Sequence, residues 1–359
     1  MLISTRSRAR SDDDGARANK RPKLEVAPAQ AAPAEAEEAD AQPALPQRHP
    51  VLWFDEGNVI VAACGRSFRL HSGVLAHHSD VFKELTSAPA LAALEKLAGC
   101  AVLRVEDEGE VLAQLLQIMY DGGKSRWFRA EEELVSFAEL RSVSIIAHKY
   151  AVQEVLDVAK AKLSRCYPSD SFKSLNGPAL GQPESGVHYR DSIAVVQLCR
   201  LMEWTEMLPT ALYQCATLPD ITPLIDGVRY GEELVLLDDV DTALCLEARD
   251  QLAAEYRRTL KILFDFGLME TNSIQPASCM KPAKCRTVLA RLASNALVAD
   301  TWLCVTGADG IDTFLNSDGI EQPCTDCWEA LMHAVDQRAK EVWDQLGEIF
   351  QVKPWPPSH

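Results

Sequence analysis

The chain has 359 residues, of which 47% are hydrophobic and 25% charged, so it is long enough for two globular domains with apolar cores. Its formal net charge is −16 and its pI is about 5.0, which argues against a general affinity for the phosphate backbone. We therefore expect no direct binding to nucleic acid.

The number of cysteines and the length of the apolar stretches predict the protein's location in the cell. The chain has 11 cysteines, an odd number that cannot all pair, and Met1–Arg10 lacks the apolar core of a secretory signal. No uninterrupted apolar stretch reaches the length of a membrane span. We expect an intracellular protein of the nucleus or cytoplasm that makes no membrane contact.

The first 48 residues are rich in Ala, Pro, Glu, Asp, Arg and Ser and show no sustained periodicity. Such a composition cannot bury enough apolar surface to offset the entropy of ordering, so we predict a disordered tail over residues 1–48. A basic cluster within it is formed by Lys20, Arg21, Pro22 and Lys23. The cluster is either a nuclear-localisation signal or part of a solubilising basic tail.

The first structured stretch is a strand hairpin that runs into helices. Val59–Ala63 is an apolar run, the pattern breaks at Gly65-Arg66, and Ser67–Leu70 alternates with period two. From Val74 to Leu85 the apolar residues recur at three- and four-residue steps, which predicts helices.

Further elements follow in order up to Pro168. We predict a helical piece at 91–97, a strand at 101–106, and a helix that begins at Asp107–Glu110 and ends at Gly122-Gly123. Two helical stretches cover 131–150, and an amphipathic helix covers 152–166, before Pro168 ends the run.

Ordered sequence blocks within this region resemble the BTB/POZ domain family. The blocks are Phe-Arg-Leu-His at 68–71, Val-Leu-Ala at 74–76, Ser-Asp-Val-Phe at 79–82, the strand at 101–107, Leu115–Gly122 and Ile145–Val152. The resemblance implies a BTB/POZ domain over 49–168, with a three-stranded sheet and helices. It assigns the domain core to Phe68, His71, Leu75, Ser79, Val81, Phe82, Tyr120 and Tyr150.

The resemblance also implies a function in binding other proteins. Such domains form homo- or heterodimers and recruit partners, and some carry substrates to the cullin scaffold of ubiquitin ligases. Asn58 stands where the family often has an Asp that dimeric transcription factors use. We expect a non-enzymatic interaction protein that pairs with itself, with a cullin adaptor as the alternative, in which 131–166 would contact the scaffold.

Beyond Pro168 the pattern becomes helical after a linker. Residues 169–189 contain Gly177-Pro178, Gly181 and Pro183, which are typical of a connecting loop. An all-α domain is predicted over 190–352, followed by a C-terminal tail over 353–359. Its helices are expected at 193–207, 211–218, 240–266, 282–298 and 324–350.

Four cysteines of the helical domain form a candidate metal site. Cys324 and Cys327 have ligand spacing at the start of the last helix, and Cys279 and Cys285 lie upstream with a wider spacing. Together they would give zinc four sulfur ligands, with Cys304 as a substitute. The alternatives are ordinary buried cysteines or a thiol redox pair at 324 and 327.

Other polar clusters are expected to have structural roles. His77 and His78 are adjacent and point to different helix faces, and Asp238, Asp239 and Asp241 lack the Gly and Glu of a calcium loop. The three aspartates are expected to cap the helix that they precede. No nucleophile elbow, phosphate loop, metalloprotease motif or dinucleotide fingerprint is present, so no enzymatic activity is predicted.

Overall fold

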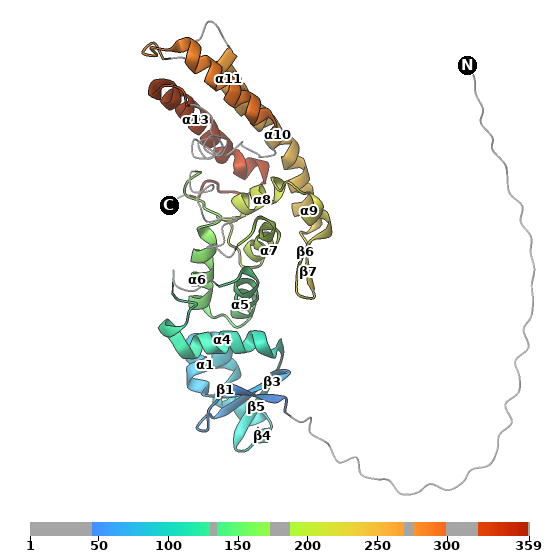
Figure 1. Cartoon of the computed structure of the whole chain (residues 1–359). Helices are drawn as coiled ribbons and strands as arrows, with labels where there is room; N and C mark the ends of the chain where they lie inside the picture. The colour runs from blue at the N-terminus through green and yellow to red at the C-terminus, as the bar shows by residue number, and fades with distance from the viewer. Residues whose placement is uncertain (1–44, 130–134, 173–186, 269–275, 299–321, 358–359) are drawn as a thin grey trace, which may run out of the picture. The chain divides into compact units, whose positions relative to one another are not determined.

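The computed structural model describes residues 45–129, 135–172, 187–268, 276–298 and 322–357 (Figure 1). Its contacts group Leu45–His359 as one compact unit. The N-terminal half of this unit is an α+β structure, and mostly helical structure follows. Residues 1–44 of the expected tail and positions 173–186 of the expected linker lie outside the described residues, whereas Gln47 and Arg48, at the end of the tail predicted over 1–48, belong to a strand.

A mixed five-stranded sheet organises the N-terminal half. Its strands are β1 (Gln47–Trp53), β2 (Val59–Cys64), β3 (Arg66–Leu70), β4 (Lys96–Leu97) and β5 (Cys100–Glu108). They lie in the order β1-β3-β2-β5-β4. β2 pairs antiparallel with β3 and parallel with β5, which places Val61 opposite both Phe68 and Leu103.

The expectation of a three-stranded sheet was wrong, because two edge strands were not predicted. β1 contains Pro50, a residue that disfavours strand prediction. It pairs in parallel with β3, so no tight turn joins it to its partner and no hairpin signal marks it. β4 has only two residues and pairs antiparallel with β5 at the end of the predicted 91–97 helix. Strands this short carry no readable alternation.

Six helices accompany the sheet. They are α1 (Ser72–His78), α2 (Asp80–Leu85), α3 (Ala88–Ala93), α4 (Gly109–Asp121), α5 (Phe137–Lys149) and α6 (Gln153–Ser164), with a 3₁₀ turn, η1, at Gly122–Lys124. α4 begins against the β2–β3 turn at Gly109. A Cβ at this position would lie 2.6 Å from the Cys64 carbonyl oxygen and from the Arg66 Cβ, so only glycine fits without a shift.

The two faces of the sheet are both covered. Val59, Val61, Phe68 and Leu70 are fully buried in the main hydrophobic core with the helices. On the other face, a small cluster of β2 and β5 residues is buried beside Leu45 and Trp53: Ile60, Ala62, Cys100 and Val102. Alternation along β2 therefore sends successive apolar side chains into two different cores.

The C-terminal half is mostly helical. Its elements are η4 (Tyr189–Asp191), α7 (Ser192–Leu201), α8 (Leu208–Ala216), α9 (Thr222–Asp226), β6 (Val228–Tyr230), β7 (Glu233–Val235), α10 (Asp239–Leu268), α11 (Pro282–Val298) and α13 (Thr325–Ile349). The helices predicted at 240–266, 282–298 and 324–350 are confirmed to within two residues.

Two details of the predicted all-α part were wrong. β6 and β7 form an antiparallel hairpin with three residues in each strand, too short to show a period of two. The helix expected at 193–207 ends at Leu201, and Glu203 just beyond it takes a positive φ of 56°. Apolar residues continue past this break, which made the helical pattern look longer.

One hydrophobic core extends from the sheet into the C-terminal helices. The main core includes α7 and α8 residues and the C-terminal part of α13, with Trp343 and Phe350. The chain after α13 also packs on this helix, because the Trp355 Nε1–H donates to the Trp343 carbonyl at 2.7 Å. Gly347 provides the space for this contact, since a Cβ there would lie 2.4 Å from the Trp355 Cβ.

A charged contact joins the two halves at the β6–β7 hairpin. The guanidinium of Arg141 on α5 donates to both carboxylate oxygens of Glu233 at 2.7 Å. The Arg141 side chain is only 7% exposed and lies over the Tyr230 ring, whose hydroxyl donates to Asp191 at 2.6 Å. Arg141 and Glu233 are 92 residues apart in sequence, so no local pattern could have predicted their contact.

We expect the variant Glu233→Gln to lose about 1 kcal/mol of unfolding free energy, because Arg141 is buried while Glu233 is largely exposed to screening. The hydrogen bonds from Arg141 lower the pKa of Glu233 below its ordinary value. The stability from this pair is therefore complete above the ordinary glutamate pKa and lost as pH falls through the lowered one. Urea unfolding at several pH values should show a weaker acid dependence for Glu233→Gln; an unchanged dependence would contradict the role.

Candidate metal centre and interaction core

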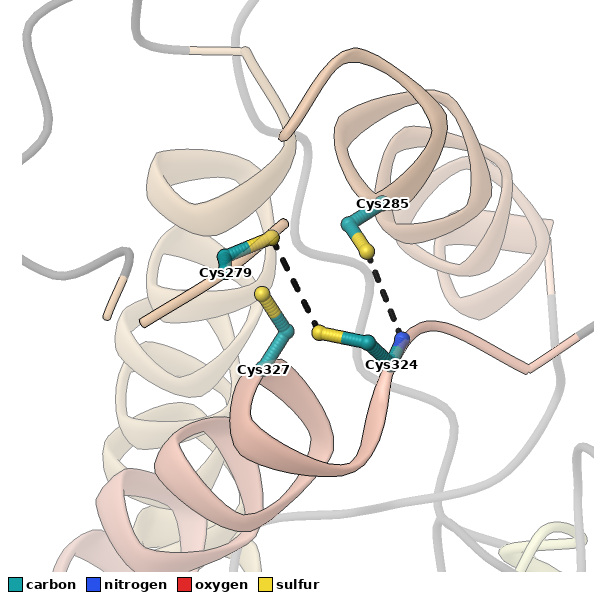
Figure 2. A group of neighbouring side chains, drawn as sticks. All are labelled: Cys279, Cys285, Cys324 and Cys327. Atoms are coloured by element: carbon teal, nitrogen blue, oxygen red, sulfur yellow. Dashed lines mark hydrogen bonds between the residues drawn. The ribbon is translucent and has the colours of Figure 1, made fainter. Parts of the chain in front are cut away.

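The four predicted cysteine ligands meet at one point. The sulfur atoms of Cys279, Cys285, Cys324 and Cys327 all lie within 4.8 Å of one another. Figure 2 shows the side chains converging from the loop before α11, the first turn of α11 and the start of α13. Among the described residues, this is the only group of three or more potential metal ligands gathered so closely. Cys304 lies outside the described residues.

Helix starts position three of these sulfurs. Cys324 is the N-cap residue of α13, and Cys327 lies in its first turn. Cys285 lies in the first turn of α11, where its backbone N–H donates to the Lys281 carbonyl at 3.0 Å. The positive ends of both helices favour thiolates, and the Cys324 backbone N–H donates to the Cys285 Sγ at 3.3 Å.

The spacing of the sulfurs fits a tetrahedral ion. Zinc–sulfur bonds of about 2.3 Å place the ligands of a regular tetrahedron about 3.8 Å apart. The Cys279 and Cys324 sulfurs are 3.7 Å apart. This separation is far too long for a disulfide, in which the sulfurs lie about 2.05 Å apart. The four cysteines could therefore hold a zinc ion.

The thiols of the cluster differ in acidity. Burial opposes ionisation of Cys279, but the Lys281 backbone N–H and the neighbouring thiols together lower the pKa of Cys279 to about 7. Burial raises the pKa of Cys285. A thiolate at Cys279 is therefore accessible near neutral pH, as a soft metal ligand requires.

Four other cysteines lie in the main core and serve as apolar side chains. Cys166, Cys199, Cys215 and Cys245 are buried, and burial raises the pKa of the Cys166 thiol to about 11. Their sulfurs form no potential metal group among the described residues. These four thiols pack in the core as small apolar side chains, because apolar helices surround them.

The residues that the resemblance assigns to the domain core make two sets of contacts. In the first, the rings of Phe82 and Tyr150 stack at 4.3 Å between centroids, with an interplanar angle of 3°. Ser79 caps α2 by accepting from the Phe82 N–H, and its hydroxyl donates to the Tyr150 carbonyl at 2.5 Å. Val81 is partly buried against the same core. We call Ser79, Phe82 and Tyr150 the aromatic clasp.

The second set joins the end of β3 to α4. The His71 backbone N–H donates to the Tyr120 hydroxyl at 2.9 Å, and the His71 ring lies 3.2 Å from the same oxygen. The partner of the His71 ring thus lies 49 residues away in the sequence, whereas the His71 carbonyl accepts locally from the Val74 N–H at 3.0 Å. Phe68 and Leu75 are fully buried beside these contacts.

Other polar groups also have structural contacts, and of the three aspartates expected to cap a helix, Asp238 is shown to do so. The Asp238 side chain accepts from the Asp241 N–H at 2.7 Å, and so caps the first turn of α10. Asp241 itself accepts from Arg200 at 2.6 Å. His78 pairs with Glu154, and its ring meets that of His77 edge-on. Asn58 caps α1 by accepting from the Ser72 N–H at 2.8 Å.

Two further findings concern the remaining expectations. Lys20, Arg21, Pro22 and Lys23 lie outside the described residues. Among the helices of the described ranges, none is both long and apolar enough to cross a bilayer.

The sequence matches no protein-family model, and no curated protein shows significant similarity to it.

Proposed function

We propose that this chain is a non-enzymatic interaction protein that pairs with itself and recruits other proteins through a BTB/POZ-like module over residues 49–168. The observation that supports this most directly is the aromatic clasp. It fixes the start of α2 to the end of α5, and so joins a helix reached from the β2–β3 hairpin to one that follows β5. Preorganised surfaces of this kind suit docking.

The sheet offers one long edge for self-association. β1 has seven residues and lies at the end of the strand order, whereas the opposite edge, β4, has only two. Val51 on β1 is 63% exposed. An exposed strand edge with an apolar side chain is a template for pairing with another chain. A second copy would bring an identical edge, as a two-fold interface requires.

Light scattering of the full-length protein at tens of micromolar should give twice the chain mass of 39.6 kDa. Val51→Lys should shift this to the monomer, because a charge at a paired edge disfavours pairing. Leu97→Lys, on the two-residue edge strand β4, is the matched control and should remain dimeric. A wild-type chain that is monomeric throughout this range would remove self-pairing from the proposal.

We further propose that the four cysteines bind a structural zinc ion. Four protein sulfurs would occupy all four coordination positions of a tetrahedral zinc ion. No position would remain for substrate or water, so a catalytic role is not supported. Cys285 and Cys327 are buried, at 2% and 0% exposure. The helices α10, α11 and α13 share a separate small core of Leu260, Leu289, Leu292, Ala293, Leu331 and Val335.

The size of that core explains why a metal would be useful. Only six residues of this core are fully buried, with partly buried neighbours such as Phe264 and Trp328 packed against them, so it is much smaller than the main core. A bound zinc would fix the start of α11 to the start of α13 at the end of this core. The zinc proposal is independent of the interaction module, because its residues all lie beyond residue 275.

A further inference from the structure

The stretch from α9 to the start of α10 exposes an unusual set of apolar side chains. Its members, with one from the end of α7, are Leu201 at 48% exposure, Ile225 at 59%, Leu234 and Leu236 at 41% and Val240 at 66%. We call these five residues the hairpin patch. Single exposed apolar side chains are normal, but a group on adjoining elements marks a binding surface.

Backbone geometry brings Ile225 and the two leucines of the patch together. α9 ends at Asp226 and Gly227 follows it; an added Cβ on Gly227 would lie 2.9 Å from a Leu236 methyl group, so Leu236 lies against the end of the helix that carries Ile225. Leu234 lies in β7 and Leu236 directly follows it, and burial alternates along this stretch: Leu234 and Leu236 are exposed, whereas Val235 and Leu237 are buried.

Contacts from α7 hold the other two members in place. The Gln197 side chain donates to the Leu236 carbonyl at 2.5 Å, and Leu201 lies one helical turn further along the same face of α7. Arg200 pairs with Asp241, the residue after Val240. α7 thus contacts the chain on both sides of the segment from Leu236 to Val240, and the patch is fixed before any partner arrives.

The segment that carries four of the five residues of the hairpin patch has an excess of negative charge. Between residues 225 and 240 the exposed charged side chains are one basic residue, Arg229, and five acidic ones: Asp226, Glu232, Glu233, Asp238 and Asp239. Glu233 pairs with Arg141, which still leaves a clear acidic excess. An apolar surface with an acidic border selects partners that carry positive charge.

We propose that the hairpin patch binds a basic amphipathic helix of a partner protein, with apolar side chains at three- and four-residue spacing and Lys or Arg on its flanks. Such a helix lays its apolar stripe on the five exposed side chains while its cations face the acidic border. A second copy of this chain would set acidic borders against each other, and anionic lipid or nucleic acid would be repelled. The charge pattern therefore favours a basic partner over these three.

The test uses the full-length protein and a labelled synthetic helix of about 18 residues, built from Ala with a Leu stripe and flanking Lys. Fluorescence anisotropy should give a dissociation constant in the micromolar range. The variant Leu234→Ser/Val240→Ser should weaken binding at least about tenfold. Glu232→Gln/Asp239→Asn should weaken it and reduce its salt dependence. Leu97→Ser, 44% exposed on β4, is the matched control and should bind as the wild type does.

Several outcomes would overturn the proposal. Binding that persists in Leu234→Ser/Val240→Ser but disappears in moderate salt would show mere attraction to an acidic protein. Equal affinity for a probe with Glu in place of Lys would remove the charge argument. A dimer that dissociates in Leu234→Ser/Val240→Ser but not in Val51→Lys would make a second copy the occupant. Because the self-pairing test rests on β1, the two proposals can fail separately.

Discussion

Replacing Cys279 by serine should abolish zinc binding and lower the unfolding free energy of the α10, α11 and α13 region by about 4 kcal/mol or more, the range reached when a structural metal is lost. Cys279 is partly exposed, so the exchange of sulfur for oxygen hardly alters packing. Any large effect must then come through the metal. The measurements are zinc per chain by atomic emission and thermal unfolding by circular dichroism.

Matched variants make this result specific. Cys64→Ser changes an exposed thiol on β2 outside the cluster and should retain one zinc per chain. Cys279→His supplies a nitrogen ligand in place of sulfur and should restore part of the zinc content. Cobalt(II) should give the intense visible bands of a tetrahedral site in the wild type and in Cys64→Ser, but not in Cys279→Ser. The site would be refuted if the wild-type protein held no zinc and its stability were the same with and without a chelator.

Truncating Phe82 to alanine should lower the unfolding free energy by about 3–5 kcal/mol, as expected for a fully buried phenylalanine. The ring is fully buried and stacks on Tyr150, so its removal leaves a cavity in the main core. Since that core extends into α7, α8 and α13, we expect the loss to appear in both halves of the chain. Urea unfolding followed by circular dichroism and tryptophan fluorescence measures it.

Tyr150→Phe is the companion variant, because it retains the stacked ring and removes only the hydroxyl that donates to Asp107 at 2.5 Å. Lys149 still pairs with that carboxylate, so a cost of about 1 kcal/mol is expected. If Tyr150→Phe cost as much as Phe82→Ala, the polar contact and not the stack would hold the aromatic clasp. The destabilisation from Phe82→Ala and that from Cys279→Ser should also appear in different parts of the chain, because Phe82 lies in the main core, whereas Cys279 lies in the cysteine cluster at the starts of α11 and α13.

The sequence determined the features that depend on neighbouring residues. The long helices α10, α11 and α13 follow from sustained apolar periodicity, and the β2–β3 hairpin follows from alternation broken by a tight turn. The four-cysteine site was also predictable, because ligand spacing and helix starts are local signals, although the wider Cys279–Cys285 pair made it uncertain which sulfurs would meet.

Only the tertiary structure decided the contacts between distant segments. β1 and β4 are recognisable as strands through their pairing with β3 and β5, and Arg141 finds Glu233 across 92 residues. The hairpin patch arises in the same way, because three-residue strands show no period and the exposure of Leu234 depends on what the rest of the chain leaves uncovered. Local sequence sets the preference of each segment, whereas burial and partner choice belong to the folded chain as a whole.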